Sequence, residues 1–395
     1  MGISTIKQWN PPLCVGKPLP VDEEAFFRSA RRVFASGRFA NNGPEVDKLE
    51  ARMAELSGKR DAVAVCNATL GLELCLRSLA DHGTWVAVPT WTFPAAPQAI
   101  CAASMKPLFQ DVADITPEST MFHQPAVPIQ ESGRRRSIGA FMGFLAWGRT
   151  NGAAKWVERS LKSYSPIIFD AAHALGCAGV KRVGGDAHVY SLHCTKQTSG
   201  FEGGVVCTDN LALAKDIRRR RNFGYSLDAE SEIRKQGYPD LVQRGTNAKM
   251  HELSAAMANL SLEHLDDTIG AYKARYFWYE DALQDCANIK LLPYPDGHNY
   301  QYIVLHWTGQ TPLDRVCRRL YERGVCARRY FAPGCHRMPT FWGFASDYYH
   351  PTFEGANFMS DHTLVVPTGP QMSQDDVGIL CEMLRKMSEE ECVSV

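Results

Sequence analysis

The sequence predicts an α/β protein in which a largely parallel sheet lies between helices and a smaller α+β unit follows. Two patterns lead to this class: seven short apolar runs alternate with helical or loop stretches up to residue 208, and helical periodicity dominates after it. Runs that are apolar on both faces and separated by long connections are typical of parallel strands buried under helices. With 395 residues, 45% of them hydrophobic, the chain has material for about two or three domains.

The apolar runs are the expected strands, because they are shorter than ordinary helices, which span about ten residues or more. In chain order they are AVAVC at 62–66, WVAVP at 85–89, KPLFQD at 106–111, IGAFMGF at 138–144, PIIFDAA at 166–172, HVYSLH at 188–193 and GGVVCT at 203–208. We therefore expect one mostly parallel seven-stranded sheet that is sandwiched by helices.

A long helical stretch at 251–283 follows, with apolar residues recurring every three or four positions. Such a stretch, leaving a sheet, predicts a connector to a second unit. A strand at 301–307, a further helix and a final helix at 375–387 then predict a smaller α+β region. We expect a large α/β domain over 1–262 and a small C-terminal α+β domain over 263–395.

Composition excludes several classes of function. The 43 basic residues balance the 43 acidic ones, which gives no reason to expect nucleic acid or a membrane as partner. No run of about eighteen apolar residues occurs, so we expect a cytoplasmic protein. The thirteen cysteines are odd in number and contain no C-x-x-C pair, which predicts reduced thiols. The twelve histidines show no metal-ligand spacing, so we expect no metal.

Asp170 and Lys196 are the residues that point to a chemistry. Asp170 ends one apolar run, and Lys196 follows the end of a later one, in SLHCTK. A pyridoxal phosphate enzyme needs an acid that keeps the ring nitrogen protonated and an amine that forms an imine. The pair therefore predicts an enzyme with this cofactor.

A phosphate site is expected beside them, in CNATLGLEL. Asn67, Ala68 and Thr69 lie where a strand ends and a helix begins, and free N–H groups and the helix dipole favour an anion there. Ser191, at a strand end, could add a second hydroxyl. The alternative for such residues is an ordinary helix cap or a serine that bonds the backbone.

Two residues could contact the cofactor ring. Phe93, after a strand end, could lie against the pyridine, and His173 could bond the ring oxygen. An aromatic residue or a histidine at such a place is also a common core residue.

Seven motifs occur in the order GRFANNGPEVDKLEARMAELSG, CNATLGLEL, VPTWTFPAAPQAI, FDAAHALG, SLHCTKQTSGFEGGVV, RNFGY and GTNAKMHELSAAMANL. In this order they resemble the DegT/DnrJ/EryC1/StrS family, the sugar aminotransferase branch of fold type I pyridoxal phosphate enzymes. The similarity extends from about residue 20 to 388. It implies the fold type I, aspartate aminotransferase-like architecture and pyridoxal 5'-phosphate as cofactor.

The resemblance gives roles to the residues around the ring. Lys196 matches the Schiff-base lysine, and Asp170 matches the acid paired with the pyridinium nitrogen. His173 occupies the position beside the ring oxygen, and Phe93 matches the stacking aromatic.

It also implies the phosphate contacts. Ala68 and Thr69 match the phosphate-binding turn, which lacks the usual glycine here, and Ser191 matches the serine that joins them. Asn247 matches an asparagine that reaches the phosphate of the neighbouring subunit, so a homodimer with shared active sites is implied.

For the substrate, Tyr330 and His336 lie in the tail motif that borders the sugar-nucleotide pocket in relatives. The arginine often found two positions after the asparagine is Lys249, which weakens any bidentate contact there.

The function implied is transfer of an amino group from an amino acid, L-glutamate by resemblance, to a keto-sugar nucleotide such as an NDP-4-keto-6-deoxyhexose in amino sugar biosynthesis. The same chemistry on a keto-cyclitol or another small ketone is an alternative, and so is a pyridoxal phosphate-dependent sugar dehydratase. A non-catalytic regulatory protein is disfavoured, because the lysine, the acid and the phosphate turn are all present.

Overall fold

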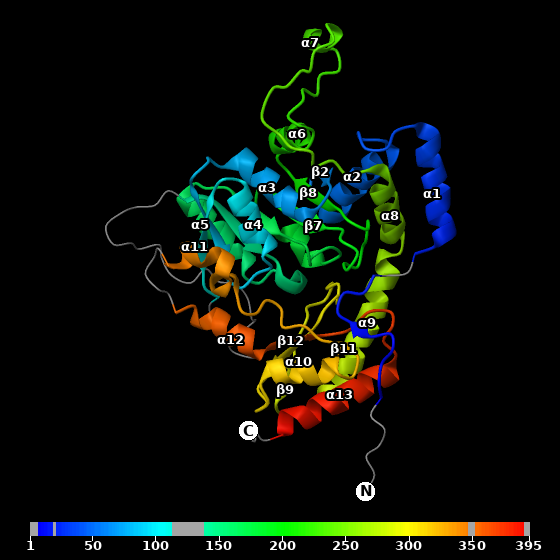
Figure 1. The fold of residues 1–395 in the computed structure, drawn as a ribbon, viewed down its shortest axis with the longest axis vertical. Coiled ribbons are helices and arrows are strands. Elements are labelled where there is room, and N and C mark those ends of the chain that lie inside the picture. The colour runs from blue at the N-terminus through cyan, green and yellow to red at the C-terminus, as the bar shows by residue number, and fades with distance from the viewer. Residues whose placement is uncertain (1–6, 19–20, 113–137, 347–351, 391–395) are drawn as a thin grey trace.

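The computed structural model describes residues 7–18, 21–112, 138–346 and 352–390. The seven-stranded sheet and its helices form one part, and a smaller unit lies below it in Figure 1. The long helix α9 (Leu265–Leu283) runs from the first part into the second.

All seven predicted runs form strands of one sheet. They are β2 (Asp61–Val65), β3 (Trp85–Pro89), β4 (Lys106–Gln110), β5 (Ile138–Phe144), β6 (Ile167–Asp170), β7 (Ala187–Ser191) and β8 (Gly204–Thr208). Their order in space is β2-β8-β7-β6-β5-β3-β4, and β8 runs antiparallel to the other six strands of this sheet. The predicted mostly parallel sheet is confirmed.

Helices cover both faces of the sheet, and strand residues alternate between two cores. On one face the core includes Val63, Val189 and Val206, and on the other it includes Ala62, Tyr190 and Val205. The first face is covered by α3 (Ala68–Leu79), α4 (Ala95–Ala102) and α6 (Leu211–Arg220). The second is covered by α2 (Pro44–Ser57), α5 (Ala153–Ser163) and α8 (Glu252–Glu263). Burial on both faces explains why the strands read as continuous apolar runs.

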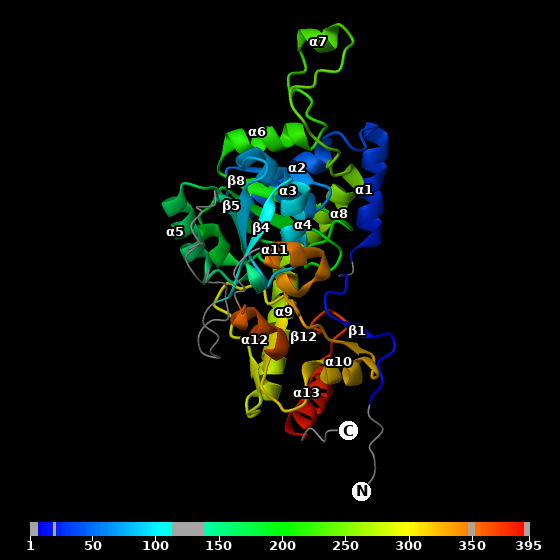
Figure 2. The ribbon, with the colours of Figure 1, turned by 60° about the vertical axis from the view of Figure 1, so that its left-hand side comes forward.

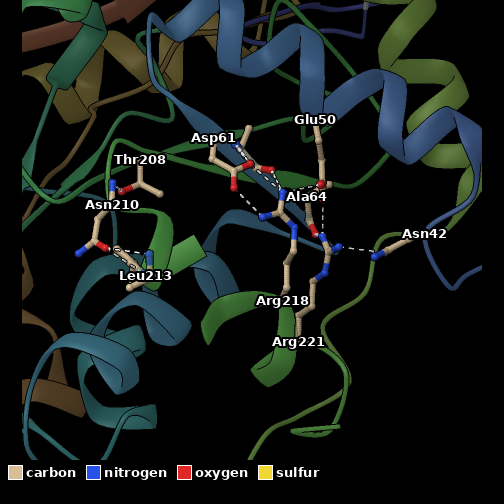
Figure 3. A network of polar contacts seen from close by, with 11 residues as sticks. Asn42, Glu50, Asp61, Ala64, Thr208, Asn210, Leu213, Arg218 and Arg221 are labelled. Atoms are coloured by element: carbon tan, nitrogen blue, oxygen red, sulfur yellow. Dashed lines mark hydrogen bonds and ion pairs between the residues drawn. The ribbon is translucent and has the colours of Figure 1, made fainter. Parts of the chain in front are cut away.

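An ion network fixes α6 to the sheet (Figure 3). Arg218 donates to both carboxylate oxygens of Asp61 at 2.7 Å, and its pairing lowers the pKa of that carboxyl. Arg221, only 1% exposed, donates to Glu50 Oε1 at 2.6 Å and to Asn42 Oδ1 at 2.9 Å. These arginines of the basic run are therefore structural, because carboxylates and an amide of the protein already satisfy them.

The lower unit has its own core, built from α9, a small sheet and two further helices. The core includes Tyr279, Leu305, Val316 and Leu380. Its antiparallel sheet has the order β12-β10-β9. The elements are β9 (Ile289–Leu291), β10 (Ile303–Trp307), α10 (Leu313–Tyr321), β12 (Thr363–Val366) and α13 (Gln374–Glu389).

The N-terminal segment packs with the lower unit up to Cys14, and Val15 then joins the core on the first face of the large sheet. β1 (Leu13–Cys14) pairs in parallel with β11 (Val325–Cys326), and Trp9 lies in the lower core. The division into domains at 1–262 and 263–395 stays a prediction, and β1 joins the first range to the second.

Further helices and 3-10 turns complete the described part of the chain. They are α1 (Glu23–Ser36), α7 (Glu232–Lys235), α11 (Trp342–Ser346) and α12 (Glu354–His362), with 3-10 turns at Ala146–Gly148, Ala178–Arg182, Cys335–Arg337 and Pro339–Phe341. The arm of residues 226–243, which carries α7, projects away from the sheet in both views (Figures 1 and 2). Across the described ranges, no helix combines the length and the apolar character needed to cross a membrane.

Candidate active site

A cavity of about 620 Å³ lies at the edge where β2, β6 and β7 end. Eight of the residues predicted for the site line it: Ala68, Thr69, Phe93, Asp170, His173, Ser191, Lys196 and Tyr330. They come together because the carboxyl ends of parallel strands lie on one edge of a sheet, where ligands of α/β proteins usually bind.

Asp170 is the last residue of β6 and is only 4% exposed. Its Oδ1 accepts a hydrogen bond from the N–H of Ala172 at 3.0 Å. Burial raises the pKa of this carboxyl to about 6, and the Ala172 N–H and the charge of Lys196 oppose the rise. A cationic ring nitrogen beside Asp170 would stabilise the carboxylate that burial destabilises.

Lys196 follows β7 and is one of the residues that line the cavity. Its Nζ donates to Tyr302 Oη at 3.1 Å. Burial lowers the pKa of this amine, while Tyr330 and Asp170 act in the opposite direction. A lowered pKa increases the neutral fraction of the amine, and the neutral amine is the nucleophile and the base.

His173 is 5% exposed, and burial lowers its pKa well below the usual value, so its imidazole is neutral. The N–H of Trp147 donates to His173 Nδ1 at 3.2 Å. The ring proton therefore lies on Nε2, which remains able to donate a hydrogen bond to a ligand oxygen.

The turn before α3 has the donors that a phosphate needs. The Asn67 side chain caps the helix by accepting from the Leu70 N–H at 2.8 Å. The N–H groups of Ala68 and Thr69, the first two residues of the helix, have no carbonyl partner within it. The Thr69 hydroxyl and Ser191 line the same cavity. Free N–H groups at a helix start form an anion site.

A close approach of β8 holds this turn in place. A Cβ on Gly204 would lie 2.5 Å from Ala68 N and 2.6 Å from the carbonyl carbon of Asn67. A glycine is required at Gly204 because any side chain would displace the turn.

The cavity, the acid, the amine and the N–H groups together fit pyridoxal 5'-phosphate, with Ala68, Thr69 and Ser191 suited to its phosphate.

Phe93 lines the cavity and is 53% exposed, as a side chain available for stacking would be. Trp91, two positions earlier, is 1% exposed and packs edge-on against Trp147 and Phe331. The two aromatic residues of this segment therefore separate into one that faces the cavity and one that belongs to the core.

Two predicted residues lie outside the cavity lining. Asn247 is exposed, forms a bridge with Asn222 and accepts from Lys249 Nζ at 2.8 Å. His336 bonds Thr90 Oγ1 at 2.8 Å through Nδ1 and Asn357 Oδ1 at 3.3 Å through Nε2. Both nitrogens of His336 thus have partners in the protein. The roles given to these two residues stay predictions.

Tyr302 and Arg328 are functional candidates that the sequence analysis missed. Tyr302 contacts Lys196 from the lower unit, and Arg328 lines the cavity. Tyr302 lies among apolar residues at the start of a strand, and Arg328 lies in a run of two arginines, so neither carried a distinctive pattern.

The family model described as "DegT/DnrJ/EryC1/StrS aminotransferase family" matches residues 20–385 of the chain. A relative from Shigella dysenteriae, dTDP-4-amino-4,6-dideoxy-D-glucose transaminase, is 26% identical over 384 residues, which cover 95% of this chain and 99% of the relative. The spore coat polysaccharide biosynthesis protein SpsC of Bacillus subtilis (strain 168) is 26% identical, over 93% of this chain and 95% of its own length.

Among solved structures, DesI in the presence of its TDP-sugar product is similar to this chain, with a TM-score of 0.82 and 32% identity. The match covers 97% of this chain and 94% of that one. An aminotransferase, TlmJ, from Streptoalloteichus hindustanus has the same fold, with a TM-score of 0.79, 23% identity and coverage of 95% and 98%.

Proposed function

Because this chain belongs to the DegT/DnrJ/EryC1/StrS aminotransferase family, we propose that it transfers the amino group of L-glutamate to a keto-sugar nucleotide, such as an NDP-4-keto-6-deoxyhexose. Enzymes of this family are pyridoxal 5'-phosphate-dependent aminotransferases. The observation that carries the proposal is the joint placement of Asp170, Lys196 and the Ala68–Thr69 turn around one cavity. A nucleotide-sugar acceptor is supported by the names of the relatives, which include a dTDP-aminosugar transaminase and DesI with a TDP-sugar.

The cofactor, when bound, supplies an electron-withdrawing ring that accepts the charge developed at the carbon losing its proton. Asp170 keeps the ring nitrogen protonated, because a buried carboxylate is stabilised by a cation beside it. Lys196 would take the proton from the α-carbon of the donor and deliver it to the carbonyl carbon of the cofactor, across the nitrogen that joins them, since its lowered pKa gives it a neutral form. His173 would hold the ring oxygen of the cofactor by donating a hydrogen bond from Nε2.

An anionic group of a substrate has a candidate partner in Arg328. This residue is exposed at the cavity, and its guanidinium has no hydrogen bond or ion pair within the described part of the chain. The next residue, Arg329, is already paired, since it donates to Ser360 O at 2.8 Å and Asp361 Oδ1 at 3.2 Å. A free arginine fork matches a carboxylate or a diphosphate.

The homodimer with shared active sites also belongs to this proposal. The arm of residues 226–243 exposes apolar side chains, among them Tyr238 at 66%, Leu241 at 57% and Val242 at 52%. Exposed apolar groups on a projecting segment favour a protein contact. Asn247 lies directly after this arm, and in a dimer it would reach the neighbouring phosphate. Analytical ultracentrifugation tests the dimer, and a monomer at micromolar concentration would contradict it.

The cytoplasmic location of the protein stays a prediction.

The decisive experiment is amino transfer itself. Purified protein loaded with cofactor is incubated with L-glutamate and a panel of keto-sugar nucleotides, keto-cyclitols and small ketones. Release of 2-oxoglutarate and the mass of each aminated product are followed by mass spectrometry. Amination of a keto-sugar nucleotide supports the proposal. Amination of a cyclitol alone would move the acceptor to that alternative, and loss of water without amination would indicate a dehydratase.

A further inference from the structure

The segment of residues 298–302 connects the lower unit to the cavity. Just before β10, His298 Nε2 donates to Trp147 O at 2.7 Å, and Asn299 Nδ2 donates to His173 O at 2.9 Å. Gln301 Nε2 donates to Thr195 O at 3.4 Å. The last residue of the segment, Tyr302, is thereby brought beside both His173 and Lys196.

Tyr302 is rigidly placed. It is 3% exposed, and its backbone carbonyl accepts from Tyr294 Oη at 2.8 Å. Its ring lies 4.4 Å from the His173 ring, centroid to centroid. Within the described ranges, the Tyr302 hydroxyl has one hydrogen-bond partner, Lys196 Nζ at 3.1 Å. A buried tyrosine hydroxyl normally finds a partner, and here that partner is the reactive amine.

We infer that Tyr302 is a positioning residue for Lys196: its hydroxyl holds the amine on the His173 side of the cavity and accepts a hydrogen bond from it when the amine is protonated. The inference deepens the proposed function and rests on the role of Lys196 in proton transfer. A hydroxyl suits this task because it accepts from an ammonium and donates to a neutral amine without becoming charged itself.

The groups around Lys196 and Tyr302 decide whether the tyrosine hydroxyl raises or lowers the pKa of the amine. The titratable groups that face Lys196 and Tyr302 are Asp170 at the end of β6, His173 after it, Tyr272 on α9, Tyr294 after β9 and Tyr330 after β11. Burial raises the pKa of Tyr302 and of the three other tyrosines, so each keeps its proton and none supplies a negative charge. Burial lowers the pKa of Lys196, and a hydrogen bond to its protonated form acts against that fall. Loss of the hydroxyl should therefore lower the pKa of the amine further.

The first test needs no substrate. Full-length chain freed of cofactor is mixed with pyridoxal 5'-phosphate at a series of pH values, and the rate of capture is followed by visible absorbance. In Tyr302→Phe the pH midpoint of capture should fall by about half a unit or more. The matched control is Tyr279→Phe, which removes another buried hydroxyl, bonded to Pro367 O at 2.7 Å, and should leave the midpoint unchanged. Tyr302→Met, which also lacks the hydroxyl, serves as a second variant if the first fails to fold.

The second test uses the loaded enzyme in a single turnover with L-glutamate. The rate constant in Tyr302→Phe should fall about tenfold to a hundredfold, because a misplaced base costs rate. The glutamate concentration for half-maximal rate should stay within about twofold, since Tyr302 is buried behind Lys196 and is not among the residues that line the cavity. Unchanged midpoint and rate constant in a folded variant would overturn the inference. If wild type transfers nothing from glutamate, the proposed function fails, while a shifted capture midpoint still supports the role of Tyr302.

Discussion

Glu252 and Gly43 meet at the start of α2, where Glu252 Oε1 accepts a hydrogen bond from the Gly43 N–H at 2.9 Å. The same carboxylate accepts from the N–H groups of Glu45 at 2.8 Å and Val46 at 3.3 Å, and it is fully buried. A side chain from the start of α8 thus caps a helix that lies far away in the sequence, and the helix dipole adds to the attraction. This contact joins α2 to α8, both of which cover the second face of the sheet.

Glu252→Ala should lower the free energy of unfolding by about 2–4 kcal/mol, because three buried N–H groups lose their acceptor. Urea unfolding of the full chain, followed by circular dichroism, measures the change. The control is Glu263→Ala on the same helix, whose carboxylate is solvent-exposed in an ion pair with Lys48 at 3.2 Å. It should have a much smaller effect. Equal destabilisation by the two variants would contradict the capping role.

Lys196→Ala should abolish amino transfer and the covalent attachment of the cofactor, since no other amine lines the cavity among the described residues. The fold should persist, because the lysine makes a single hydrogen bond to another side chain. Borohydride reduction followed by peptide mapping identifies the labelled residue in wild type. Lys386→Ala, at an exposed ion pair on α13, should remain active. Retained turnover in the Lys196 variant would refute its assignment.

Arg328→Gln should weaken the binding of one substrate by about tenfold or more, because a charge-assisted hydrogen bond is lost. The two half-reactions are measured separately by absorbance, first with L-glutamate and then with the keto-sugar nucleotide. An effect on the first would place the donor carboxylate at Arg328, and an effect on the second would place the diphosphate there. Arg329→Gln, whose guanidinium is already paired within the protein, should change neither half-reaction by more than about twofold. Arg328 has no anionic partner if its variant behaves like that of Arg329.

The stability of the cofactor-free chain should depend on pH through Asp170. Its folded pKa of about 6 lies above the value of 3.8 expected for the unfolded chain. The stability contribution is therefore fully present below about pH 4 and is lost as the pH rises through about 6, a difference of about 3 kcal/mol. Urea midpoints at about pH 4.5 and 7 test this. Asp170→Asn should remove that part of the dependence, and bound cofactor should suppress it, since a cation then compensates the carboxylate.

The sheet and the chemistry could both be predicted from sequence, for related reasons. The strands are buried on both faces, so each is a run of apolar residues that stands out locally. Asp170 ends one of these runs, and Lys196 lies shortly after the end of another. The order in which the strands lie side by side could not be predicted, because it depends on packing between distant segments. The contacts of Glu252 with Gly43 and of Tyr302 with Lys196 are of the same kind. Each contact joins residues far apart in the chain. A single glutamate or tyrosine in the sequence gives no local pattern that would predict such a partner.

The hydrogen bonds that the 298–302 segment makes to Trp147, His173 and Thr195 have a practical consequence for engineering. Acceptor range in such enzymes is an attractive target for chimaeras in which one relative contributes the N-terminal half and another the C-terminal half. In such a chimaera one relative would contribute the donor side chains at 298–301. The backbone carbonyls that accept from them would come from the other relative. A chimaera that keeps Lys196 can therefore place Tyr302 wrongly beside it, unless the donor and acceptor segments are taken from the same relative.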